Sequence, residues 1–120
     1  MIVAFSYYSR NRWTALGTHS AQDWVQLELS APKRVGSVEL YLWGNGRSIT
    51  APRRYVIQYW DGNAWLAARV LSQVPLLPQA SSVNTVQIEP VTTGKIRIVF
   101  EHDLPAVSGM TEIIIRNPEP

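Results

Sequence analysis

The sequence predicts an all-β protein, an antiparallel sandwich or barrel, and three observations lead to this prediction. Apolar residues recur at every second position in short segments spread over the 120 residues. Gly, Pro, Asn and Asp break these segments at fairly regular spacing, which is typical of all-β folds. No window has the periodicity of a convincing amphipathic helix. A chain of this length buries a core as one domain without disulfides.

Six segments carry the alternation, and each is predicted to form a strand. Residues 36–43 are unusual because Tyr41 and Trp43 make the face opposite the apolar one aromatic. The predicted strands are residues 24–29, 36–43, 54–60, 83–89, 95–100 and 111–116. The side chains expected to face the core in the first three are Val25, Leu27, Leu29, Val38, Leu40, Leu42, Tyr55, Ile57 and Tyr59.

A Gly-centred turn with a tryptophan on each side lies in residues 58–65, QYWDGNAW, and predicts a hairpin. If the turn has two residues, Trp60 and Trp65 lie on the same face in either register, as direct or diagonal neighbours. Hairpin packing alone produces such a pair, so we interpret it as packing and not as a ligand platform. Trp13 and Trp24 are likewise expected mainly to pack.

The composition excludes several classes of function. The chain has no cysteine, which excludes a disulfide framework, a thiol nucleophile and a thiolate metal site. Its net charge of +2 is spread along the chain and forms no basic stripe, so we expect no nucleic-acid partner. No segment approaches the roughly 20 apolar residues of a membrane span. The start, MIVAFSYYSR, lacks the regions of a signal peptide, so any export signal is expected outside this sequence.

The predicted loops offer no catalytic constellation. His19 and His102 lie in two different loops, and no nucleophile motif accompanies them. A glycosidase needs two carboxylates placed across the scissile bond, and the sequence does not pair the acids in or beside the loops. We therefore predict that the chain is not an enzyme. The predicted loops are residues 10–22, 44–53, 73–82 and 101–109.

Four blocks, in this order, resemble one family: DWVQLELSAPKRVGSVELYLW, PRRYVIQYWDGNAW, NTVQIEPVTTGKIRIVF and GMTEIII. The chain resembles the discoidin, or coagulation factor 5/8 type C, domain family from about residue 12 to residue 116. It is most similar to the bacterial branch of carbohydrate-binding modules, family 32-like, that are appended to glycoside hydrolases. The resemblance implies a non-catalytic jelly-roll β-sandwich, galactose-binding-domain-like, with ligands held by loops at one end. We expect one domain over residues 1–116 and a tail over residues 117–120.

A sugar site needs an aromatic ring face for stacking and a few polar side chains for the hydroxyl groups. The loop that follows residues 36–43 offers both, and it resembles in kind the aromatic, His, Arg and Asn site of the family. Other polar side chains come from the loop over residues 10–22 and from the EHDL stretch over residues 101–104. The expected ligand-binding residues are Trp43, Asn45, Arg47, Arg53, His19 and His102.

The sequence departs from the family in the loop that usually supplies a structural calcium site. The residues before Trp13 are FSYYSRNR, and no Asp or Glu precedes Asp23. Calcium prefers six to eight oxygen ligands, several of them carboxylates. Only Glu112 has a counterpart among the family's usual ligands, so a retained calcium is doubtful. The family's first strand is either lost or replaced by the segment MIVAF.

The resemblance therefore predicts a carbohydrate-binding accessory module of a bacterial, secreted polysaccharide-degrading enzyme. Its expected partners are galactose-, arabinose- or rhamnose-type glycans and the parent catalytic domain, and we expect a monomer. The alternative is a structural sandwich that packs against the catalytic domain and binds no sugar, which a large exposed apolar patch would favour. Binding of protein, or of phospholipid through LLPQA near Arg69, is less favoured.

Overall fold

The computed structural model describes the backbone of residues 2–6 and 13–14, and residues 22–102, 106 and 108–118 in full. Every regular element in these residues is a strand, and none is a helix, so the all-β prediction is confirmed. The strands are β1 (Ile2–Ser6), β2 (Trp13–Thr14), β3 (Gln22–Trp43), β4 (Arg54–Trp60), β5 (Trp65–Ala67), β6 (Val70–Val74), β7 (Ser82–Glu101) and β8 (Gly109–Arg116).

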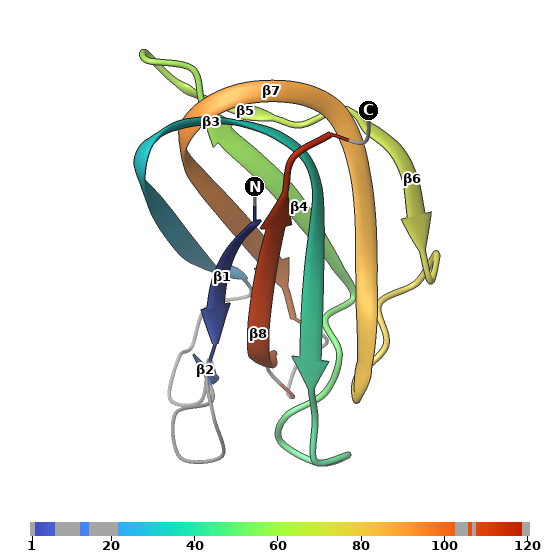
Figure 1. Cartoon of the computed structure of the whole chain (residues 1–120). Helices are drawn as coiled ribbons and strands as arrows, with labels where there is room; N and C mark the ends of the chain where they lie inside the picture. Colours follow the sequence, from blue (N-terminus) through green and yellow to red (C-terminus); the bar gives the residue numbers. More distant parts are fainter. Residues whose placement is uncertain (1, 7–12, 15–21, 103–105, 107, 119–120) are drawn as a thin grey trace.

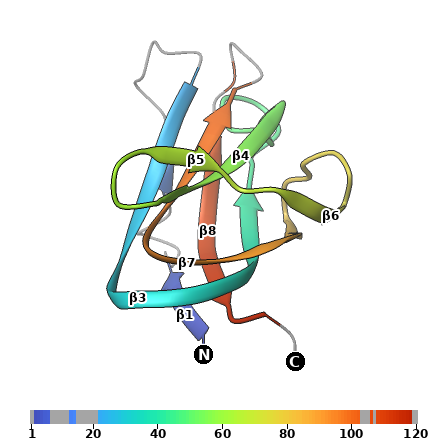
Figure 2. The same ribbon diagram turned by 90° about the horizontal axis from the view of Figure 1, so that it is seen from above.

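Two long strands, β3 and β7, pass through both layers of a sandwich (Figure 1). Residues 22–28 of β3 pair with residues 95–101 of β7 in one layer, and residues 37–42 pair with residues 82–87 in the other. The register shifts in the stretch between these blocks, where both strands bend over together (Figure 2). Apolar alternation stops at this bend, because residues 29–34 and 89–92 are exposed or half-buried. The four segments predicted in these regions are strand, but they are not separate, because each pair of them is joined through the bend into one long strand.

All strand pairs are antiparallel. The front layer has the order β1-β8-β3-β7-β6, with β2 also pairing with β8, and the back layer has the order β3-β7-β4-β5. The family's first strand is not lost: β1, from the segment MIVAF, takes its place, because Ile2–Ser6 pairs with β8 at the edge of the front layer. The predicted β-sandwich is thereby confirmed.

The core lies between the layers and is made of the inward positions of each strand. It includes Val38, Leu40, Val86, Ile96, Ile98 and Phe100, all at 0% exposure. Burying such side chains stabilises the fold by about 1.5–3 kcal/mol each. The predicted inward residues Val25, Leu27, Leu42, Tyr55 and Ile57 belong to the same cluster, and Tyr59 packs against it.

The hairpin between β4 and β5 adopts one of the two predicted registers. Trp60 lies directly opposite Trp65, and the two rings are 5.5 Å apart at their centroids. Gly62 at the turn has φ +105°, a backbone region that side chains with a Cβ rarely enter. The Asp61 carboxylate accepts hydrogen bonds from the backbone N–H groups of Asn63 and Ala64, which lower its pKa. The expected same-face tryptophan pair is confirmed.

Candidate functional site

A hollow of about 360 Å³ opens at the end of the sandwich where β3 ends and where β7 and β8 begin. We call it the Trp43 hollow. Tyr41 and Trp43 reach it because they alternate with the buried Leu40 and Leu42 along β3. The hollow combines two aromatic side chains with the hydroxyl groups of two serines and a threonine. Its lining residues are Tyr41, Leu42, Trp43, Ser81, Ser82, Val83 and Thr111.

The serines of the Trp43 hollow are positioned by a buried asparagine. Asn84 is 0% exposed, and its Nδ2 donates to the carbonyl oxygens of Gln79 and Ser82 while its Oδ1 accepts from the backbone N–H of Gln79. Ser81 also donates its backbone N–H to Leu42 O at 2.9 Å. Ser81 has φ 58°, an uncommon backbone conformation for a residue other than glycine. Sequence reasoning missed Asn84, although a polar residue at an inward position of residues 83–89 signals it.

The loop after Trp43 is built around Asn45. Its Oδ1 accepts hydrogen bonds from the backbone N–H of Arg47 at 2.8 Å and of Ile49 at 3.0 Å, and its Nδ2 donates to Ser48 Oγ at 3.2 Å. Ile49 is completely buried and anchors the loop. The amide of Asn45 is thus engaged by its own loop, and Asn45 positions that loop.

Arg47 and Arg53 are both exposed at this end of the sandwich. Arg53 donates its backbone N–H to Glu101 O at 2.8 Å, which places it beside the end of β7. Within residues 22–118, as far as they are described, neither guanidinium has a hydrogen-bond or ion-pair partner. Both remain candidates for ligand contact. His19, the sixth candidate, lies outside the described residues.

His102 does not lie at an exposed rim, as the sequence suggested, because it is 2% exposed. Its Nε2 lies 2.9 Å from Asp23 Oδ2 and its Nδ1 lies 2.9 Å from Ser108 Oγ, so both ring nitrogens are engaged. The order Ser, His, Asp is that of a hydrolase triad. Ser108 is, however, 0% exposed, and no substrate reaches its hydroxyl group in this structure. The network instead ties the start of β3 to the end of β7 and the start of β8.

Two carboxylates, those of Glu39 and Glu112, lie near the hydroxyl group of Tyr41. Tyr41 lies opposite Glu112 on β8, and its hydroxyl group donates to Glu39 Oε2 at 3.5 Å. Burial raises the pKa of Tyr41, and the charges of Glu39 and Glu112 raise it further. At neutral pH Tyr41 is therefore a neutral phenol.

Glu112 is the one residue that the family resemblance assigned to calcium. Among the described residues, no three His, Asp, Glu or Cys side chains gather where a metal ion could be held. Because calcium prefers six to eight oxygen ligands, Glu112 and its described neighbours do not fit such a site by themselves.

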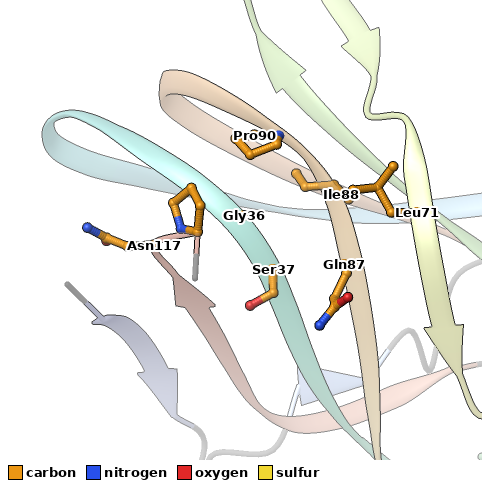
Figure 3. A pocket seen from close by; sticks show the side chains of 8 residues that line it. Gly36, Ser37, Leu71, Gln87, Ile88, Pro90 and Asn117 are labelled. Atoms are coloured by element: carbon orange, nitrogen blue, oxygen red, sulfur yellow. The ribbon is translucent and has the colours of Figure 1, made fainter. Parts of the chain in front are cut away.

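Another hollow, of about 240 Å³, lies at the opposite end of the sandwich, beside the bend of β3 (Figure 3). It is lined by Gly36, Ser37, Leu71, Gln87, Ile88, Pro90, Asn117 and Pro118. It contains no aromatic side chain, and so it offers no ring for a sugar to stack on.

Trp24 was expected mainly to pack, and its ring does pack against Arg97, but much of it faces solvent. It is 52% exposed, because it alternates with the buried Val25 and points away from the core.

The described chain is therefore an antiparallel β-sandwich with an aromatic and hydroxyl-lined hollow at its loop end. The F5/8 type C domain family matches residues 6–113, and the chain belongs to this family. No curated protein sequence matches the chain significantly. In the described residues, nothing helical has the length and hydropathy needed to cross a membrane.

Several solved structures share the fold. A chain of the Streptococcus pneumoniae β-galactosidase BgaA has a TM-score of 0.80 at 13% identity, covering 92% of this chain and 82% of that chain. A pectin-binding carbohydrate-binding module has a TM-score of 0.64 at 22% identity, with coverages of 99% and 91%. The CBM32 module of AlyQ, in complex with 4,5-unsaturated mannuronic acid, has a TM-score of 0.62 at 18% identity, with coverages of 97% and 93%.

Proposed function

We propose that this chain is a non-catalytic carbohydrate-binding module and that the Trp43 hollow is its sugar site. The observation that carries the proposal is the combination of aromatic rings and hydroxyl groups at one open hollow. Tyr41 and Trp43 offer ring faces for the C–H groups of a pyranose, and Ser81, Ser82 and Thr111 offer hydroxyl groups.

The family and the similar structures support this assignment. Two of the similar structures are carbohydrate-binding modules, one named for pectin and the other bound to a uronic acid derivative. The left-handed backbone at Ser81 adds support from within the chain, because such conformations cluster at functional sites.

The lining of the hollow favours a neutral sugar. None of its seven residues carries a charged side chain, and the hydroxyl groups both donate and accept hydrogen bonds. Galactose-, arabinose- or rhamnose-type residues are therefore the proposed ligands. Arg47 and Arg53 lie on the same end of the sandwich and would contact a longer glycan.

The module would act as part of a larger enzyme. By analogy with the β-galactosidase that shares its fold, it would hold a secreted bacterial glycoside hydrolase close to its polysaccharide. The domain itself, residues 1–116, would act as a monomer, with the catalytic domain as its partner and no nucleic acid involved.

Titration with galactose, arabinose and rhamnose oligosaccharides, followed by calorimetry, tests the proposal. Saturable binding is expected for at least one of them. Trp43→Ala should weaken that binding by about tenfold, the usual effect of removing a central Trp from a binding site. Trp24→Ala, a change of the same size outside the hollow, should leave it unchanged. Saturable binding that Trp43→Ala does not weaken would exclude the Trp43 hollow as the site.

A second function is favoured by an apolar strip on β6 and the residues after it. Val74, Leu76 and Leu77 are 67%, 80% and 72% exposed, and the strip also includes Val70 and Leu71. Clustered exposed apolar side chains mark interaction surfaces. Such a strip suits a sandwich that packs against its parent catalytic domain. The absence of binding to every sugar in the panel would favour this function.

A further inference from the structure

The outer face of the back layer carries a stack of aromatic rings around one arginine. The Cζ atom of Arg97 lies 4.1 Å from the ring centroid of Trp24 and 4.0 Å from that of Trp65. Trp65 in turn packs on Trp60. We call this arrangement the Trp24–Arg97 stack. It joins β3, β7, β4 and β5: Trp24 is a diagonal neighbour of Arg97 on the adjacent β3, and Trp65 lies two strands from Arg97, on the far side of β4.

The arginine of the stack is held in a fixed orientation. Its two flat faces are covered by indole rings, and its Nη2 donates to Gln26 Oε1 at 3.0 Å. Its Nε is buried and has no hydrogen-bond partner. A guanidinium fixed in this way loses little further freedom when it binds a carboxylate. Because Nε is buried and one N–H of Nη2 bonds Gln26, the donors left for a ligand are those of Nη1 and the second N–H of Nη2.

Arg97 is the cation that lies directly against the exposed ring of Trp24. Lys95 lies over the Trp60 ring at 5.7 Å, and the residue opposite it on β3 is Glu28. Arg54 is paired with Glu101.

Trp24 supplies the surface beside this cation. One of its ring faces lies against Arg97, yet the residue remains 52% exposed. Hairpin packing explains the contact between Trp60 and Trp65. It does not explain why a large apolar ring stays open to water beside a desolvated arginine, an arrangement that suits a partner with both an apolar face and a negative charge.

We propose that the Trp24–Arg97 stack is a second carbohydrate-binding surface, and that it takes an acidic glycan built of uronate sugars. The pyranose ring stacks on the exposed part of Trp24, and the sugar carboxylate accepts hydrogen bonds from the edge of the Arg97 guanidinium. The stack belongs to the back layer, where residues 22–28 of β3 pair with residues 95–101 of β7. The residues that line the Trp43 hollow come from the parts of β3, β7 and β8 that form the front layer, and Figure 1 shows the two layers. The two sites therefore differ in position and in the charge of their ligands.

A short oligogalacturonate and its fully methyl-esterified form are the probes, since they share one sugar backbone and differ in charge. The methyl ester is a neutral, galactose-type glycan that the Trp43 hollow would also take, so binding to the stack is measured on the Trp43→Ala chain. This chain should bind the acid form, should bind it more weakly as sodium chloride is raised, and should bind the ester poorly. Trp24→Ala should weaken binding of the acid by about tenfold. Arg97→Lys keeps the charge but loses the planar fork, so it should weaken binding as well. Leu77→Ala removes an exposed apolar side chain outside both proposed sugar sites, so it is the control and should have no effect.

NMR of the five tryptophan indole groups provides a measurement that does not depend on a variant folding. In the wild-type chain, the Trp24 indole signal should shift with oligogalacturonate while the Trp43 signal stays in place.

Three results would each overturn the proposal: no binding of the acid by a folded Trp43→Ala chain, equal binding of the ester by that chain, or full binding of the acid when Trp24→Ala is added to it and the protein remains folded. None of them bears on the neutral sugars proposed for the Trp43 hollow, which are titrated separately.

Discussion

Tyr55 on β4 carries a hydroxyl group into the core, and its removal should stabilise the protein. The residue is 8% exposed, and its hydroxyl oxygen is buried with no hydrogen-bond partner. An unpaired buried hydroxyl group costs about 1–3 kcal/mol in folded proteins. Tyr55→Phe keeps the ring and removes this cost, so the free energy of unfolding at pH 7 should rise by about 1 kcal/mol.

The same burial predicts how the gain depends on pH. Burial raises the pKa of Tyr55 from its ordinary value of 10.0 to about 12. Between these two values the unfolded chain loses the phenolic proton while the folded chain keeps it, so wild-type stability falls as pH rises through this window. The fall due to Tyr55 amounts to at most about 3 kcal/mol. The Tyr55→Phe variant has no phenolic proton at this position, so its free energy of unfolding should fall less than that of the wild type as pH rises through the same window.

Urea unfolding of both proteins at pH 7 and at several values from pH 9 to about 11.5 measures the two effects, with the slope of the transition as a check on two-state behaviour. The difference between variant and wild type should be positive at pH 7 and should widen above pH 10. A variant that is less stable at pH 7 by more than about 1 kcal/mol would show that the hydroxyl group has a partner, and the reasoning would fail.

Two further predictions concern the ends of the sandwich. Asn45→Ala removes the three hydrogen bonds that the side chain makes within its loop, and it should lower stability by about 1–2 kcal/mol; faster amide exchange confined to residues 45–49 should accompany the loss, and unchanged exchange would contradict it. Gly36→Ala should destabilise by about 1–3 kcal/mol, because a Cβ there would lie 2.5 Å from the Cα of Pro118. Gly94→Ala is the control, since its Cβ would meet nothing within 4 Å, and thermal unfolding compares the two; equal melting temperatures would refute the clash.

Alternation of apolar residues predicted the core strands because one face of each strand packs against the other layer. The same rule failed for β6, whose residues are almost all exposed at a sheet edge, so that no alternation marks them. It also failed at the bends of β3 and β7, where residues 33–35 pair with residues 91–93 and only Val35 and Thr93 of these are buried, so that no alternation marks the pairing. Hydrogen bonding between distant backbone segments leaves no trace in the order of apolar and polar residues.

The candidate site was predictable in part. Trp43 was singled out as an aromatic residue at a strand end, and it does line a hollow. His102 could not be placed, because its burial depends on Asp23 and Ser108, which arrive from two other strands or their connections. For Trp24, the sequence predicted packing but not the partner of its ring. Because Trp24 alternates with Val25 along β3, the sequence already placed it on the outer face. Its ring contact with Arg97 depends on the register between β3 and β7, which the sequence does not show.

The path of β3 and β7 through both layers also bears on how the protein folds and opens. Their ladder joins residues as far apart in the chain as Gln22 and Glu101, and contacts of such long sequence separation make folding slow. The back layer cannot detach from the front one without breaking a continuous pair of strands. The sandwich should therefore exchange its core amide protons as one cooperative unit, with partial opening confined to the strand ends and connections.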